Sequence, residues 1–160
     1  MVVQNSTKFL QFSESWKHTI ARVAFLNCDP LFHSLESPWK VLAAPPSWLT
    51  GHLLRRDCVL APIPAADYAK HHEELILVPE LGICSKGEVG SVLLFGNTTV
   101  EEMRSVALPS DSASSVALLK YILKTNGLSP EFKTMAPEIE PMLNDCDGAL
   151  LIGDRALEYA

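Results

Sequence analysis

The sequence predicts an α/β fold with parallel-rich sheets, and three observations support this class. Short apolar runs of strand length alternate with helical segments along the chain, which is the pattern of parallel strands joined by helical crossovers. The chain has 160 residues, 48% of them hydrophobic and 20% charged, which suffices for one core or two small lobes. The alternation starts again after Gly96, which indicates a second lobe.

The chain up to Gly96 is expected to contain a polar extension and a first lobe. Residues 1–19 have mixed polarity and no clear period, so they are expected to form an N-terminal extension. Residues 20–96 are expected to form the first α/β lobe. Apolar, β-favouring runs predict its strands at residues 20–26, 39–44, 58–63, 75–79 and 89–95. Helices are predicted at residues 30–36, 48–56 and 65–71, the second with Ser47 as its N-cap.

Residues 97–160 are expected to form the second α/β lobe. Its strands are predicted at residues 105–108, 131–134 and 149–152. Its helices are predicted at residues 98–103, 114–126 and 138–144. Gly127 is a suitable end for the middle helix, because glycine readily adopts the left-handed conformation that often follows a helix.

Charge and hydropathy argue against several kinds of partner. The net charge is −6, and no run rich in lysine or arginine is present, so a nucleic-acid partner is not expected. No apolar stretch reaches the roughly 20 residues of a membrane span, and the first residues lack the apolar core of a secretory signal. A cytoplasmic protein is therefore expected. The four cysteines lack the paired spacing of zinc or redox sites and are interpreted as buried, reduced thiols.

Motifs of several common enzyme classes are absent from the sequence. It contains no G-x-S-x-G elbow, no P-loop and no dinucleotide-binding glycine pattern, which argues against the common hydrolase and nucleotide-binding classes. The pairs His71/His72 and Asp145/Asp147 are interpreted as solvated surface residues and not as metal ligands. No metal site is expected.

Three polar clusters lie where predicted strands end or begin: Asn27 with Asp29, Gly90 with Ser91, and the serines before the helix at 114–126. Asn27 can orient a substrate, or it can form a structural turn before Pro30. The serines Ser112, Ser114 and Ser115 can help to cradle a carboxylate or phosphate at a helix N-terminus, or they can merely cap that helix. The residues alone predict a two-lobed protein that binds a small anion.

Several blocks of the sequence resemble one enzyme family. Residues 22–27 (RVAFLN), followed by Pro30 and Leu31, resemble the first strand of the chorismate dehydratases of menaquinone biosynthesis by the futalosine route, where an aromatic-Leu-Asn triplet closes the strand. Further blocks resemble the family in the same order, at residues 46–47, 59–68, 81–83, 90–95, 112–119 and 149–157. The sister enzyme that makes dihydroxynaphthoate opens with a different, Pro-Asn-Asp type segment. This chain departs from the family pattern at Cys28 and Asp29.

The resemblance implies a fold like that of type II periplasmic-binding proteins, with two α/β lobes, a hinge and the ligand in the cleft between them. In the family the chain continues past the Ile-Gly-Asp block and completes the first lobe. The resemblance therefore predicts that this chain is truncated at its C-terminus and that its first lobe is incomplete. An exposed sheet edge in such a fragment would favour self-association.

The resemblance also implies a reaction and a set of site residues. The family is a group of hydro-lyases, which convert chorismate to 3-enolpyruvylbenzoate and water without a cofactor. Asn27 would orient the ring substituents, and Asp29 or the substrate's own enolpyruvyl carboxylate would take the proton. The substrate-binding residues would be Ser91, Ser112, Ser114, Ser115, Gly153 and Asp154. The alternatives are a non-catalytic protein of the same fold that binds a small carboxylate, and an inactive fragment.

Overall fold

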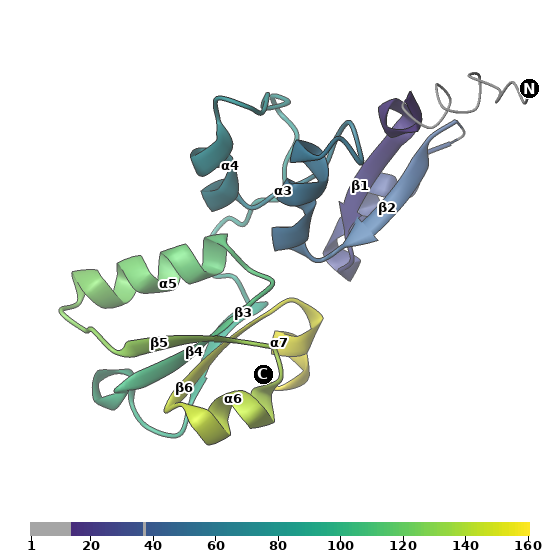
Figure 1. Ribbon diagram of the computed structural model, residues 1–160. Coiled ribbons are helices and arrows are strands. Elements are labelled where there is room, and N and C mark those ends of the chain that lie inside the picture. Colours follow the sequence, from purple (N-terminus) through teal and green to yellow (C-terminus); the bar gives the residue numbers. More distant parts are fainter. Residues whose placement is uncertain (1–13, 37) are drawn as a thin grey trace, which may run out of the picture. The chain divides into compact units, whose positions relative to one another are not determined.

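The computed structural model describes residues 14–36 and 38–160, and internal contacts divide the chain into two units (Figure 1). The N-terminal unit comprises Met1–Ile63 and the C-terminal unit Pro64–Ala160. Most of the predicted extension at residues 1–19 lies outside the described residues. Its described part forms the short 3-10 helix η1 (Ser15–His18) and begins the first strand.

The N-terminal unit is built around β1 (Thr19–Val23). This strand pairs in parallel with β2 (Lys40–Ala44), with Ala21 opposite Leu42. On its other side, the amide of Ala21 donates to the carbonyl of Leu60 over 2.8 Å, so β1 is flanked on both sides. The remaining elements of this unit are η2 (Leu26–Cys28), α2 (Asp29–Phe32) and α3 (Pro46–Leu54).

One hydrophobic cluster forms the core among the described residues of this unit. It includes Ala21 and Val23 of β1, Leu49 of α3 and the thiols of Cys28 and Cys58. Burial raises the pKa of both thiols above the ordinary value, so they are protonated near neutral pH and behave as small apolar groups. The prediction of buried, reduced thiols is confirmed for these two and for Cys146, but it is wrong for Cys84, which is exposed.

The C-terminal unit contains a four-stranded sheet in the order β3-β6-β4-β5. The strands are β3 (Val92–Gly96), β4 (Ser105–Pro109), β5 (Glu131–Met135) and β6 (Gly148–Ile152). β4 is parallel to both β5 and β6, whereas β3 is antiparallel to β6. The helical elements are α4 (Ala65–His71), η3 (Val100–Glu102), α5 (Ser114–Thr125), α6 (Ile139–Asp145) and α7 (Asp154–Glu158).

Helices cover both faces of this sheet, with α5 on one side and α6 and α7 on the other (Figure 1). Successive strand residues point to opposite faces. Leu150 therefore joins the cluster that contains Val116 and Leu119 of α5, while Leu151 joins the cluster with Met142 of α6. Every residue of β6 is buried, which explains its uninterrupted apolar sequence.

The alternation of strands and helices is confirmed as a mixed α/β fold with parallel-rich pairing. The helix at residues 65–71 and the strands at 105–108, 131–134 and 149–152 lie within a residue of their predicted bounds. β3 pairs with β6 and so lies in the sheet of the C-terminal unit, although residues 89–95 were assigned to the first lobe. The lobe boundary at Gly96 stays a prediction.

Three predictions of local structure are wrong. Residues 75–79 form no strand, and Ile76 is 96% exposed, because the segment finds no strand to pair with. Residues 58–63 make only a single bridge, at Leu60. The helix at 98–103 is only the short turn η3.

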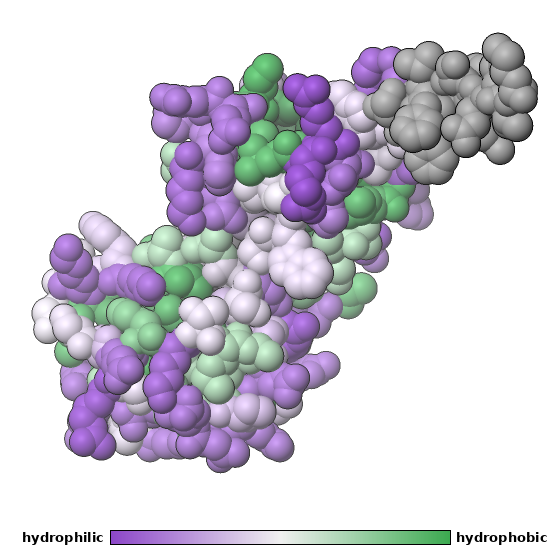
Figure 2. Space-filling view, in the orientation of Figure 1, coloured by the Kyte–Doolittle hydropathy of each residue, from purple (hydrophilic) through white to green (hydrophobic). Residues whose placement is uncertain are grey.

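Apolar side chains also reach the surface of both units, among hydrophilic ones (Figure 2). They include Val41 on β2 and Tyr121 on α5. Scattered exposure of this kind is normal for a folded protein. Among the described residues, no helix is both long and apolar enough to cross a membrane.

Candidate functional site

The loops after β4 and β6 leave the sheet of the C-terminal unit in opposite directions. The two strands are adjacent and parallel. The loop after β4 leads to α5 on one face, and the loop after β6 leads to α7 on the other. In open α/β sheets, ligands usually bind at the carboxyl ends of strands whose following loops diverge in this way.

The structure brings the predicted substrate-binding residues of the C-terminal unit to this edge of the sheet. Ser112 is buried in the loop after β4, and Ser114 and Ser115 begin α5. Gly153 and Asp154 follow β6, and the amide of Gly153 donates to the carbonyl of Ser91 over 2.8 Å. Ser91 reaches the same edge because β3 runs antiparallel to β6.

The start of α5 does not have a conventional side-chain cap. Its N-cap residue is Ala113, which makes no side-chain cap hydrogen bond. Ser114 Oγ instead accepts a hydrogen bond from the amide of Ala66 at 3.1 Å, which ties α5 to the start of α4. The positive end of the α5 dipole therefore lies at this edge of the sheet without an N-cap side chain to offset it.

An ion pair that was not predicted from the sequence joins the two loops at the same edge of the sheet. Arg155 Nη1 of α7 donates to Asp111 Oδ2 in the loop after β4 over 2.7 Å. The Asp111 side chain is only 8% exposed, whereas that of Arg155 is 46% exposed. Asp111 Oδ1 is buried and has no hydrogen-bond partner in the described part of the chain. Their positions in the sequence could have indicated them, because Asp111 directly precedes the predicted Ser112 and Arg155 directly follows the predicted Asp154.

Asn27 and Asp29 form a separate cluster in the N-terminal unit, beyond the carboxyl end of β1. Asn27 lies exposed in η2, and Asp29 begins α2. Arg22 Nη2 contacts Asp29 Oδ1 at 2.6 Å. The intervening Cys28 is buried, and because burial raises the pKa of its thiol, it is not poised to act as a nucleophile.

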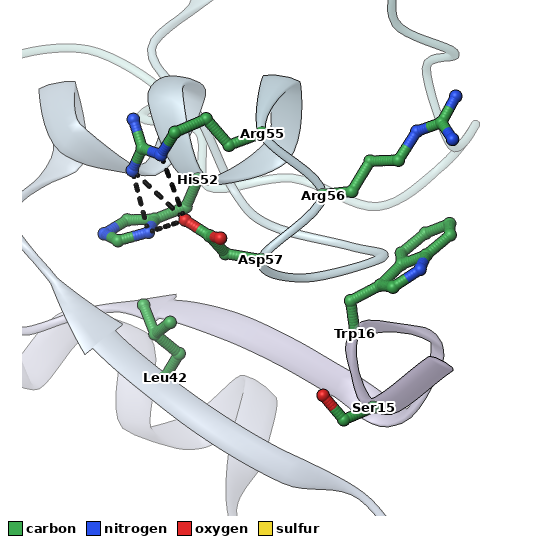
Figure 3. Close-up of a pocket in the computed structure, with 7 residues that line it drawn as sticks. All are labelled: Ser15, Trp16, Leu42, His52, Arg55, Arg56 and Asp57. Carbon is green, nitrogen blue, oxygen red and sulfur yellow. Dashed lines mark hydrogen bonds and ion pairs between the residues drawn. The ribbon is translucent and has the colours of Figure 1, made fainter. Parts of the chain in front are cut away.

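An open pocket of about 620 Å³ lies elsewhere in the N-terminal unit (Figure 3). Figure 3 shows Asp57 bonded to both His52 and Arg55, at 2.8 Å and 3.2 Å. The bond from His52 is the main cause that lowers the pKa of Asp57 below its ordinary value. Arg56 lies over the ring of Trp16, 5.9 Å from its centroid. None of the predicted site residues lines this pocket. Trp16, which does line it, precedes β1, whereas the predicted site residue Asn27 follows β1.

The pairs that resembled metal ligands in the sequence make other contacts. Asp147 Oδ2 accepts bonds from the amides of Arg104 and Ser105 and from the Ser105 hydroxyl, which lowers the pKa of Asp147. Asp145 pairs with Lys133 at 3.2 Å. The side chains of His71 and His72 bond to Glu74 and to the carbonyl of Ala69.

Fold and site together define an α/β protein whose sheet edge gathers hydroxyls, backbone amides and a guanidinium, the donors that hold small carboxylates. The chain belongs to the menaquinone biosynthesis family, whose model matches residues 18–160. It is also 38% identical over 135 residues to a protein of Thermus thermophilus named chorismate dehydratase. That match covers 84% of this chain and 49% of the relative, so the chain spans about half the length of the relative. The resemblance seen in the sequence is confirmed.

Proposed function

We propose that the protein is a chorismate dehydratase, a hydro-lyase that converts chorismate to 3-enolpyruvylbenzoate and water in the cytoplasm. The observation that carries this proposal is the 38% identity to a relative of that name across most of the chain. A two-lobed fold like that of type II periplasmic-binding proteins is part of the proposal. The two units, with polar residues beyond the ends of strands in each, are consistent with it.

The reaction needs orientation and proton transfer. One C–H bond at a ring carbon breaks, its electron pair is delocalised towards the ring carboxylate, and the neighbouring C–O bond then breaks to release hydroxide, which becomes water. The ring gains aromaticity, and no electrons pass to an external acceptor. The enzyme therefore has to hold two carboxylates, align the C–H and C–O bonds and accept one proton.

The C-terminal unit supplies the carboxylate-binding part of this proposal. Backbone amides at the start of α5, with the hydroxyls of Ser112 and Ser115, can donate to a carboxylate bound at this edge of the sheet. Ser91 and Ser114 supply further hydroxyls at the same edge. The carboxylate of Asp154 would repel another carboxylate and suits a substrate hydroxyl instead.

The N-terminal unit supplies the residues proposed to act at the reacting carbons. The amide of Asn27 can both donate to and accept from the ring substituents. The proton acceptor is either Asp29 or the substrate's enolpyruvyl carboxylate. The ion pair with Arg22 engages Oδ1 of Asp29, which leaves Oδ2 as the oxygen that could take a proton.

The proposal is tested by incubating the protein with chorismate and measuring the aromatic product by chromatography. The assay uses the chain itself and a chimera in which this chain replaces the matching segment of the Thermus thermophilus protein. We expect product from at least one of these forms. The proposal is wrong if neither gives product, although the chimera is folded by circular dichroism and the unaltered Thermus protein is active. Binding of chorismate without product would favour a non-catalytic carboxylate binder.

Replacement of Asn27 by alanine is expected to affect turnover far more than binding. Loss of a group that acts mainly in the transition state should lower kcat by about 100-fold or more and change the Kd of chorismate only slightly. Steady-state kinetics and calorimetric titration measure the two effects. The matched control is Asn144→Ala, which removes an exposed amide from α6. Full activity of Asn27→Ala would remove Asn27 from the site.

Asp29→Asn separates the two candidates for the proton acceptor. If Asp29 takes the proton, this nearly isosteric change should lower kcat by about 100-fold or more, since general-base catalysis contributes on that order. A normal kcat would instead assign the proton to the substrate's carboxylate. Arg22→Gln is the control, because it removes the ion pair while leaving the carboxylate in place.

A further inference from the structure

The ion pair between Asp111 and Arg155 joins the two segments that follow the adjacent strands β4 and β6 in the C-terminal unit. Asp111 lies in the loop after β4, and Arg155 lies at the second position of α7, after β6. The contact of 2.7 Å therefore bridges the carboxyl ends of two adjacent parallel strands. A ligand bound at the carboxyl ends of these strands would lie next to the pair.

Arg155 is distinguished by its charge among the segments that follow the parallel strands of this sheet. The other cationic residues between Pro64 and Ala160 are Lys70, Lys86, Arg104, Lys120, Lys124 and Lys133. Of these, Arg104 precedes β4 at the opposite end of the sheet, and the lysines lie in α4, α5, β5 or the segment before β3. Arg155 is thus the one cation in the loops at the carboxyl ends of β4, β5 and β6 in this fully described unit.

The geometry of the pair leaves the guanidinium able to take a second partner. An arginine side chain has five N–H donors, and the bond to Asp111 uses one of them. The side chain of Asp111 is only 8% exposed, whereas that of Arg155 is nearly half exposed. Asp111 therefore acts as an anchor that holds one side of Arg155 and leaves the other donors at the surface.

The unsatisfied oxygen of Asp111 supports the same conclusion. A buried carboxylate oxygen without a donor is unfavourable, and Asp111 Oδ1 is in this state. A carboxylate and a guanidinium can pair through two parallel hydrogen bonds. Oδ1 of Asp111 can thus accept a second hydrogen bond from the guanidinium of Arg155. Two such bonds would fix the plane of the guanidinium while a ligand binds its other side.

We infer that Arg155 binds one carboxylate of the substrate and that Asp111 is the positioning residue that orients it. This inference rests on the proposed function, because chorismate carries two carboxylates and the residues expected from the sequence to bind them offer only neutral donors. A charged, forked donor recognises a carboxylate more strongly than a hydroxyl does. Arg155 therefore supplies the charge that the serines lack.

The test uses whichever form of the protein converts chorismate in the activity assay. Arg155→Ala should raise the Kd of chorismate by about 30-fold or more, the usual effect of removing one partner of a hydrogen-bonded charge pair. Arg155→Lys should show a smaller increase, because lysine keeps the charge but not the fork. Arg104→Ala is the matched control, and its Kd should stay within about twofold of the unaltered protein, since exposed charges outside a site contribute little.

Asp111→Asn distinguishes positioning from simple structural support. We expect it to weaken chorismate binding less than Arg155→Ala does, and we expect the double variant to bind no worse than Arg155→Ala alone. The double variant also leaves no unpaired buried carboxylate, so it provides the measurement if Arg155→Ala alone does not fold.

Three outcomes would overturn all or part of the inference. If Arg155→Ala or the double variant binds chorismate as tightly as the unaltered protein, Arg155 does not contact the substrate, although the proposed function stands. If Asp111→Asn lowers the Tm but leaves the Kd unchanged, Asp111 has only a structural role and does not position Arg155. If no form of the protein binds or converts chorismate, the proposed function fails and this inference fails with it.

Discussion

The two units of the chain bury their sheets to different extents. In the C-terminal unit, helices cover both faces of a four-stranded sheet, and two hydrophobic clusters fill the space between them. The described part of the N-terminal unit has one cluster and a two-stranded sheet, whose strand β2 leaves Val41 half exposed. Since burial of apolar surface is the main stabilising term, the C-terminal unit should be the more stable of the two.

The units also end their main helices with the same motif but with different residues. After α5, the amide of Leu128 donates to the carbonyl of Leu123, and Gly127 has a φ of +75°. After α3, the amide of Asp57 donates to the carbonyl of His52, and Arg56 has a φ of +60°. Both are Schellman motifs, but only glycine adopts this conformation without a steric penalty. The N-terminal unit thus retains local strain that the C-terminal unit avoids.

The largest expected loss of stability comes from truncating a large buried side chain in the core of one unit. Met142 is fully buried between α6 and the sheet, so Met142→Ala should lower the free energy of unfolding of the C-terminal unit by about 4 kcal/mol. All three tryptophans, Trp16, Trp39 and Trp48, lie in the N-terminal unit. The loss should therefore appear in denaturation followed by circular dichroism, while the tryptophan fluorescence transition changes little.

Leu49→Ala is the matched change in the N-terminal unit. Leu49 is also fully buried, and its truncation should lower the free energy of unfolding by about 3 kcal/mol. Here the fluorescence transition should move. If the two spectroscopic transitions shift together in both variants, the units unfold as one and their separate stabilities have no meaning.

A smaller effect is expected at the helix ends. Nothing lies within 4 Å of a Cβ built on Gly127, so Gly127→Ala should destabilise the C-terminal unit by about 1 kcal/mol through backbone strain alone. Arg56→Gly should have the opposite sign. It removes a similar strain from the N-terminal unit but also loses the contact with Trp16, for a net gain of about 0.5 kcal/mol. Urea titrations measure both changes, and a loss of stability in Arg56→Gly would show that the contact with Trp16 outweighs the strain.

The sequence was most informative where the local pattern and the tertiary pairing agree. β6 is apolar throughout because both of its faces are covered, and Gly127 marks the end of α5 because the turn there requires a positive φ. Residues 75–79 have the composition of a strand but no neighbouring strand, and composition cannot reveal a missing partner. The pairing of β3 with β6 was not predicted for a similar reason, since it joins segments far apart in the chain.

The sequence predicted the hydroxyls, backbone groups and carboxylates of the candidate site but not its cation. Serine and glycine at the ends of strands follow from general rules of α/β sheets, and the structure brings Ser91, Ser112 and Gly153 to one edge. The pair of Asp111 and Arg155 depends on which strands are neighbours. The order β6-β4-β5 decides this, and no local feature of the sequence encodes it.

The central position of β6 also has a consequence for the order of assembly. Of the four strands of this sheet, β6 comes latest in the sequence, yet it lies between β3 and β4 and pairs Ile152 with Val92. During synthesis, β3 and β4 leave the ribosome with unpaired edges and cannot form the finished sheet until Ile152 has emerged. Pairings between distant segments form slowly, and exposed strand edges invite association with other chains. This sheet is therefore most vulnerable to aggregation in the interval before β6 has been synthesised.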